Sequence, residues 1–315
     1  MRRDELPRHP TATYVMPRWQ AMYVSVNKAA CTSLKWLVAD LQEESRNRFY
    51  ASLSSELSRT MTIHRRDLWR NTPMAKGLPE AELAEISPDA GWFVFGVVRH
   101  PTARLFSAWQ SKLLLREPWW VARFGEADWF PRIPGSGEEI VEDFVRFVRS
   151  IAREPAQVVR NRHFAPQARL LAIGRMRYSR VYKTSELPQL LNDFEGHLRV
   201  RGWQGSGLAL QRANETPLPA IPMLFRTEVQ AASRSLYRRD FEAFGYDDAV
   251  PDGLDPSDGY SDAAVAEIQR LIERSERIGD LSRKARKLRL DAKAARSAAS
   301  PPALVRRLAR RILRS

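Results

Sequence analysis

Two segments of the chain share one order of features: an apolar strand, a short loop that carries a cation, and a helix. The first occupies residues 22–41, with its loop at 27–33, and the second occupies residues 92–115, with its loop at 99–101. The start of a helix offers free backbone N–H groups and the positive end of the helix dipole. Two such junctions in one domain therefore predict a ligand that carries two separate anionic groups.

The first loop contains a mobile cation, Lys28, followed by the small residues Ala29 and Ala30 and the hydroxyl residues Thr32 and Ser33. Small side chains let a ligand approach the backbone, and the hydroxyl groups can donate to an anion. The loop lacks the Gly-x4-Gly-Lys-Ser/Thr sequence of a P-loop. An ordinary capped helix of the core remains an alternative interpretation of this loop on its own.

The second loop places Arg99 directly after a strongly apolar strand, at the expected carboxyl end of the sheet. Ligands of open α/β sheets bind at that end. Ser107 lies eight residues further on, two turns into the following helix. Each residue also has a structural interpretation, because Arg99 could form a surface ion pair and Ser107 could bond the backbone of its own helix.

The order of the remaining patterns predicts an α/β fold with a central, mainly parallel sheet flanked by helices. Residues 1–20 have the pattern of an irregular lead-in, and residues 117–137 that of a Pro/Gly-rich loop. We divide the chain into a compact domain, residues 1–250, and a linker with a basic helical tail, residues 251–315. Further elements are expected as helices at 138–151, at 187–198 and from about 263 onward, and as a strand at 180–183.

The net charge of +14 is concentrated at the carboxyl terminus. Residues 281–315 contain 12 Lys/Arg and one Asp, so the other 280 residues carry a net charge of only +3. This balance makes nucleic acid an unlikely partner of the domain. Apolar residues between 304 and 313 fall near one face of a short basic helix, which favours contact with an anionic membrane surface. A polyanionic acceptor, self-association and disorder are the alternatives for this tail.

The single cysteine, Cys31, excludes an internal disulfide and is consistent with a reducing compartment. No run of the sequence approaches 18 uncharged apolar residues, so no transmembrane helix is expected. The first five residues carry charges and no apolar run, which is not the pattern of a secretory signal. We therefore expect a cytoplasmic protein, with the tail as its contact to the inner membrane surface.

Together the two loops resemble the donor-binding motifs of sulfotransferase family 2, which includes the carbohydrate sulfotransferases. Residues 28–33, Lys-Ala-Ala-Cys-Thr-Ser, are similar to the 5′-phosphosulfate loop of that family. Residues 95–109 are similar to its 3′-phosphate motif, usually Val-Arg-Asp-Pro-x-x-Arg-Leu-x-Ser-Ala-Tyr. His100 stands where the family usually has Asp, and Trp109 stands where it has Tyr.

Three later segments, residues 161–167, 181–187 and 237–246, also resemble segments of the family, in the same order. The resemblance implies a fold related to P-loop kinases and a donor, 3′-phosphoadenosine-5′-phosphosulfate (PAPS), with no metal. It places Lys28 at the sulfonate or the bridging oxygen, and Arg99 and Ser107 at the 3′-phosphate. The 5′-phosphosulfate is expected to be held by Lys28, Ala29, Ala30, Cys31, Thr32 and Ser33.

The acceptor hydroxyl needs a general base. His64 is the first choice, because related glycan sulfotransferases place a catalytic histidine between the two donor loops; an exposed histidine is the alternative. His163 is the second choice, or it contacts the substrate in the acceptor cleft. Trp119 and Trp120 are candidate acceptor contacts, because aromatic side chains on loops stack on sugars. A small hydrophobic cluster under the loop is the alternative for both tryptophans.

The sequence therefore predicts a PAPS-dependent sulfotransferase that acts on a hydroxyl of a glycan, a glycolipid or another small acceptor. A P-loop-like nucleotide-dependent kinase is one alternative, although the loop lacks the Walker sequence. A non-catalytic protein that binds a membrane or nucleic acid is the other, because the positive charge is concentrated in the tail.

Overall fold

One sheet organises the amino-terminal part of the fold. Its strands are β1 (Thr13–Met16), β2 (Ala21–Val24), β3 (Phe93–Val98) and β4 (Arg180–Lys183), in the spatial order β1-β2-β3-β4. β1 runs antiparallel to β2, whereas β2, β3 and β4 are parallel to one another. The predicted α/β class with a mainly parallel sheet is confirmed in this computed structural model. The structure describes residues 10, 12–51, 59–155, 158–211, 213, 216–251 and 253–299.

The strand β1 lies within residues 1–20, for which the sequence predicted irregular structure. All four of its residues are buried, and the 3₁₀ helix η1 (Pro17–Trp19) turns the chain directly into β2. Gln20 completes that turn in the left-handed conformation, at a φ of 41°. A strand of four residues that ends at a proline gives too short a pattern to identify from sequence.

The helices follow the strands in the predicted alternation. The α-helices are α1 (Cys31–Leu41), α2 (Arg46–Tyr50), α3 (Glu80–Glu85), α4 (Pro101–Trp109), α5 (Pro118–Phe124), α6 (Gly137–Arg153), α7 (Gln167–Leu170), α8 (Leu187–Val200), α9 (Thr227–Phe244) and α10 (Asp262–Ala299). Short 3₁₀ helices are η2 (Met61–His64), η3 (Arg66–Leu68), η4 (Ala75–Gly77), η5 (Pro88–Ala90), η7 (Thr184–Glu186) and η8 (Pro222–Phe225), and η6 (Gln110–Leu114) is a π-helix.

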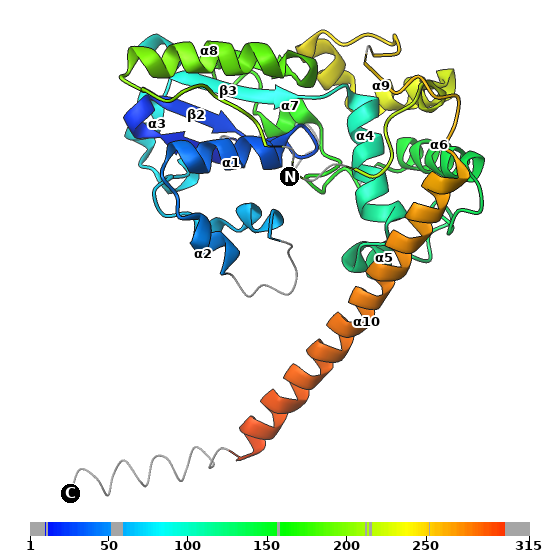
Figure 1. Cartoon of the computed structure of the whole chain (residues 1–315). Helices are drawn as coiled ribbons and strands as arrows, with labels where there is room; N and C mark the ends of the chain where they lie inside the picture. Colours follow the sequence, from blue (N-terminus) through cyan, green and yellow to red (C-terminus); the bar gives the residue numbers. More distant parts are fainter. Residues whose placement is uncertain are drawn as a thin grey trace, which may run out of the picture.

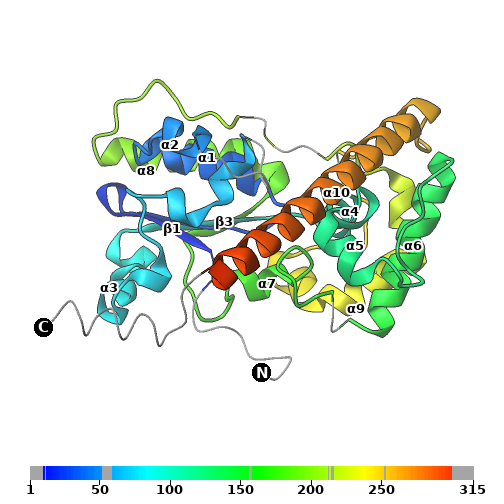
Figure 2. The same cartoon turned by 90° about the horizontal axis from the view of Figure 1, so that it is seen from below.

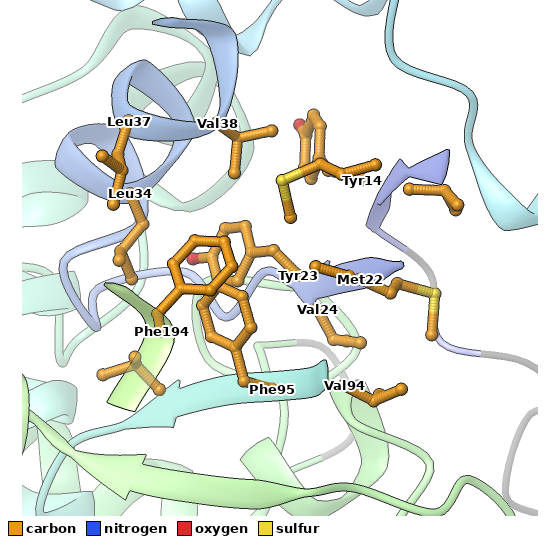
Figure 3. Close-up of a cluster of buried hydrophobic side chains, with 14 of the residues drawn as sticks. Tyr14, Met22, Tyr23, Val24, Leu34, Leu37, Val38, Val94, Phe95 and Phe194 are labelled. Atoms are coloured by element: carbon orange, nitrogen blue, oxygen red, sulfur yellow. The ribbon is translucent and has the colours of Figure 1, made fainter. Parts of the chain in front are cut away.

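Helices cover both faces of the sheet. Figure 2 shows α1, α2 and α8 on one side and α3 and α7 on the other. On the first side, Tyr23 and Phe95 are register partners whose ring centroids lie 5.2 Å apart, and Phe95 also contacts Phe194 of α8 at 5.1 Å. Leu34 and Val38 of α1 complete this cluster (Figure 3). Because β2 and β3 are buried on both faces, these two strands are apolar throughout rather than alternating.

Gly96 of β3 allows a close approach on the second side. A Cβ atom at this position would lie only 2.8 Å from the Leu171 side chain, just after α7. The absence of a side chain therefore lets the segment around α7 pack against the sheet next to the end of β3.

A second apolar core lies beside the sheet, among α4, α5, α6, α9 and the start of α10 (Figure 2). The predicted helix at 138–151 is confirmed as α6, which buries Phe144 and Phe147 in this core. Every residue of α4 is buried. The chain therefore passes from the end of β3 straight into the second core, so the carboxyl ends of the strands lie at the boundary between the two cores.

The helix α10 begins where the sequence predicted and has two different halves. Val265, Ile268 and Ile272 are buried in the second core at 4%, 0% and 1% exposure. Beyond them the helix extends away from the body (Figure 1), and Leu288 is 69% exposed. The amphipathic helix predicted between 304 and 313 lies outside the described residues. Among the described residues, no helix combines the length and the apolar character needed to cross a bilayer.

The two halves of α10 should respond differently to one substitution. Ile268→Ala removes a side chain with 0% exposure and should lower the free energy of unfolding by about 2–5 kcal/mol. Ile278→Ala, on the same helix at 53% exposure, should change it by no more than about 0.5 kcal/mol. Urea unfolding of both variants measures the difference. Equal effects would show that the start of α10 is not packed in the core.

Candidate active site

The loop between β2 and α1 has an unusual backbone. Lys28 and Ala30 both adopt the left-handed conformation, with φ values of 70° and 53°, although neither is glycine. Ala30 is the N-cap of α1 and provides no side-chain cap, so the first N–H groups of the helix have no side-chain acceptor there. Backbone N–H groups that converge in such turns form anion-binding concavities, and strained backbone of this kind gathers at functional sites.

A chain of hydrogen bonds joins this loop to His64. The Nε2 atom of His64 lies 3.0 Å from Thr32 Oγ1, and its Nδ1 atom lies 2.9 Å from Lys35 Nζ. Burial lowers the pKa of His64 to about 3, and the charge of Lys35 contributes to this shift. The imidazole is therefore neutral at physiological pH, and both of its nitrogens are engaged.

Lys28 is the central cation of the loop. Its ammonium group makes no ion pair within the described part of the chain, and burial followed by the charge of Lys112 lowers its pKa to about 8. Lys112 lies on the π-helix η6 and pairs with Glu117 at the start of α5. π-Helices frequently mark functional sites, and here one carries a second cation toward the loop.

Arg99 leaves the carboxyl end of β3 with its backbone held on both sides by one amide. Its N–H donates to Gln167 Oε1 at 2.9 Å, and its carbonyl accepts from Gln167 Nε2 at 2.8 Å. Its guanidinium makes neither a hydrogen bond nor an ion pair with any described residue, and burial lowers its pKa. Ser107 is buried on α4 at 4% exposure and, within the described residues, makes no side-chain hydrogen bond. Among the described residues, Arg99 therefore forms no surface ion pair and the Ser107 hydroxyl does not bond the backbone of its helix, so neither structural alternative is found.

Arg104 of α4 connects the first loop to the segment that carries His163. Its guanidinium, in a residue that is 1% exposed, donates to the carbonyls of Asn27 at 2.9 Å, Ala165 at 2.9 Å and Arg162 at 3.2 Å. Asn27 directly precedes Lys28, and Arg162 directly precedes His163. One buried side chain therefore fixes the position of His163 relative to the loop.

The segment around residues 161–168 is held by α9 as well. Tyr237 Oη donates to the Phe164 carbonyl at 2.9 Å, and the two carboxylate oxygens of Asp240 accept from the N–H groups of Gln167 and Ala168, each at 2.8 Å. Asp240 has 0% exposure, and desolvation raises its pKa. These contacts explain why a tyrosine and an aspartate lie three positions apart at the start of the segment 237–246.

Trp119 and Trp120 lie on the helix α5, not on the loop that the sequence predicted for residues 117–137, and they lie at different depths. Trp120 is 2% exposed and packs against Phe164 with ring centroids 5.1 Å apart, so it supports the His163 segment from the core. Trp119 is 57% exposed and is the accessible member of the pair.

His100 packs edge-on against Phe225, Phe241 and Tyr246 at ring distances of 5.3–5.6 Å. No three His, Cys, Asp or Glu side chains gather into a metal-binding group in the described ranges.

The comparison with known protein families agrees with this geometry. The model of the sulfotransferase family matches residues 11–247, which is most of the chain. The chain belongs to the sulfotransferase family. No curated protein and no solved structure shows significant similarity to it.

Within this sulfotransferase, sequence reasoning missed several side chains that surround the loop. Lys35, Lys112 and Glu117 were not identified, and Asn161 and Arg104 were noted only as parts of motifs. A signal existed for Lys35, because it lies three positions after Thr32 and that spacing places both on one face of a helix. Lys112 gave no such signal, because its direction depends on the π-helix.

Acidification should destabilise the ligand-free protein partly through His64. The imidazole has a pKa of about 3 in the folded chain against the ordinary histidine value of 6.5, so the unfolded chain binds a proton first and stability falls as the pH drops below 6.5. His64→Gln removes this titration, and the loss of unfolding free energy between pH 7 and pH 5 should shrink by up to about 2 kcal/mol. Urea unfolding at both pH values measures it. Equal losses in the wild type and the variant would contradict burial of a neutral His64.

Proposed function

We propose that this sulfotransferase uses PAPS as its donor and a hydroxyl of a glycan, a glycolipid or another small molecule as its acceptor, on a P-loop-like fold. The observation that supports this most is a pair of cations that follow adjacent parallel strands and form no ion pair with any described residue. Lys28 follows β2, and Arg99 follows β3. A partly buried cation is costly unless an anion accompanies it. Two such cations at separate positions suit a nucleotide that carries anionic groups on both its 3′ and 5′ sides.

The residues present fit such a donor. Residues 28–33 would hold the 5′-phosphosulfate through backbone N–H groups and the hydroxyls of Thr32 and Ser33. Arg99 and Ser107 would hold the 3′-phosphate, because a guanidinium binds a phosphate through two parallel hydrogen bonds. When bound, PAPS supplies an activated sulfuryl group attached to a phosphate leaving group.

The chemistry that these residues would support is an in-line displacement. The acceptor oxygen forms a bond to sulfur while the bond from sulfur to the bridging oxygen breaks, and the hydroxyl proton passes to a base. Lys28 would stabilise the negative charge that grows on the leaving phosphate. The loop and α4 position the reactants, which supplies much of the catalysis in transfers of this type.

Binding of adenosine 3′,5′-bisphosphate tests the donor site. The wild type should bind it with a Kd in the micromolar range or below, and Arg99→Ala should weaken binding by about a hundredfold, since a charge-assisted bidentate contact is lost. Arg238→Ala is the matched control, because Arg238 lies on the surface of α9 with a side chain that is 75% exposed. Isothermal titration calorimetry measures all three proteins. Failure of the folded wild type to bind would overturn the proposed donor.

We also propose that the outer half of α10 contacts an anionic membrane surface, on the cytoplasmic side. Between residues 277 and 293 the helix carries seven Lys/Arg and two Asp. Ile278, Leu281 and Leu288 lie at helical spacing and are 53%, 51% and 69% exposed. Exposed apolar residues among cations are typical of helices that lie at a membrane surface.

Charge reversal tests the membrane contact. The triple variant Lys284→Glu, Lys287→Glu and Arg289→Glu should bind vesicles that contain phosphatidylserine at least about a hundredfold more weakly than the wild type, because each near-surface cation contributes about 1 kcal/mol. Vesicles of phosphatidylcholine alone are the control, and neither protein should bind them strongly. Sedimentation with vesicles measures both. Equal binding of wild type and variant would contradict the proposal.

A further inference from the structure

The two histidines near the loop differ in what their ring nitrogens contact. His64 is engaged at both, by Lys35 at Nδ1 and by Thr32 at Nε2. An ammonium group can only donate, so Nδ1 of His64 accepts and the ring proton lies on Nε2. Nε2 then donates to Thr32 Oγ1. His64 therefore has no free lone pair with which to take a proton from an acceptor.

His163 has the opposite arrangement. Its backbone N–H donates to Asn161 Oδ1 at 3.0 Å, which fixes the orientation of that amide, because a backbone N–H cannot accept. The same oxygen lies 2.9 Å from His163 Nδ1, so the ring proton lies on Nδ1. Nε2 of His163 consequently carries a lone pair, and within the described residues no side chain or backbone group donates to it.

Hydrogen bonds from Arg104 fix the position of His163 next to the donor loop. Arg104 holds the carbonyls of Asn27 and Arg162 on one guanidinium, and these residues precede Lys28 and His163. The charge of Lys28 lowers the pKa of both histidines, as expected for groups in one small site. Trp120 packs against Phe164, the residue that follows His163. The segment that carries the imidazole is thus supported from the core.

We propose that His163 is the general base of the transfer, that Asn161 orients it, and that His64 is a positioning residue that directs the hydroxyl of Thr32 toward the donor. This inference rests on the proposed function. Nε2 of His163 takes the proton of the acceptor hydroxyl while the acceptor oxygen bonds to sulfur and the sulfur–oxygen bond to the leaving phosphate breaks. Because His64 donates to Thr32, the proton of the Thr32 hydroxyl is free to donate to the sulfonate.

The charges around His163 suit this role. Burial, then Lys112, Lys28, Arg104 and Arg162, lower the pKa of His163 to about 2, so the free enzyme holds it neutral. A neutral imidazole is the form that can accept a proton. The bound donor brings negative charge among the same cations, which raises the basicity of the ring when the reaction needs it.

Hydrolysis of PAPS, with water as the acceptor, provides a probe that requires no knowledge of the natural acceptor. His163→Ala should lower the turnover number by about a hundredfold to ten-thousandfold, the usual contribution of a general base, and added imidazole should restore part of it. His163→Gln is a second variant that keeps a polar side chain of similar size. Both should bind adenosine 3′,5′-bisphosphate within about threefold of wild type, because they leave the donor contacts intact.

His64 gives the discriminating comparison. A glutamine at this position can accept from Lys35 with its oxygen and donate to Thr32 with its nitrogen, so His64→Gln should keep turnover within about tenfold of wild type. His64→Ala should weaken donor binding. His197→Gln, on α8 and away from the loop, is the control for a histidine substitution without effect. A larger loss in His64→Gln than in His163→Gln would overturn the assignment.

Asn161 is tested by pH. Asn161→Asp keeps both hydrogen bonds and adds a negative charge, so turnover should persist while the acidic limb of its pH profile moves to higher pH. Asn161→Ala should lower turnover without that shift. If the wild type fails to bind adenosine 3′,5′-bisphosphate, the proposed donor is wrong. If it binds and His163→Ala keeps full turnover, only the base assignment is wrong.

Discussion

The arrangement of this site depends on one buried guanidinium. Arg104 has 1% exposure, and burial of its permanent charge would be strongly unfavourable without compensation. Three backbone carbonyls accept from it, and the carboxyl group of Asp240 lies close enough to act on it. Within the described residues, none of these three carbonyls accepts a backbone hydrogen bond of a helix or a strand. The irregular segments that carry them are held in place by α4 through Arg104.

Hydrogen bonds from buried polar side chains to the backbone also link the two cores of the molecule. Asp240 on α9 accepts from Gln167, and the side chain of Gln167 brackets the backbone of Arg99 at the end of β3. A helix of the second core thereby sets the position of the residue that directly follows β3. Polar networks of this kind specify one arrangement only when every member is satisfied. Asp240 and Gln167 therefore belong to the motifs because they hold the backbone of Arg99, a residue that would contact the donor.

The parts of the fold that the sequence predicted were those encoded over short distances. Residues 22–41 and 92–115 each contain a strand, a loop and a helix in one stretch, so periodicity and loop chemistry were sufficient to place Lys28 and Arg99. The contact of Lys35 with His64 spans 29 residues, and that of Arg104 with Asn27 spans 77. In neither pair does the local sequence around one residue indicate that the other residue is its partner. For the same reason, the sequence could nominate His64 and His163 but could not distinguish them, since the difference lies in the partners of each ring nitrogen.

The cations of the ligand-free site repel one another and weaken the basicity of the two imidazoles. Burial, and after it the charges of Lys112, Lys28 and Arg162, lower the pKa of both histidines. Cations brought together in a partly buried place repel one another, and the fold tolerates this because the packing around α4 is extensive. An anion that enters relieves the repulsion and at the same time raises the basicity of the imidazoles. On the proposed mechanism, the base therefore becomes effective only after the donor has bound, which links proton removal from the acceptor to the presence of the group that is to be transferred.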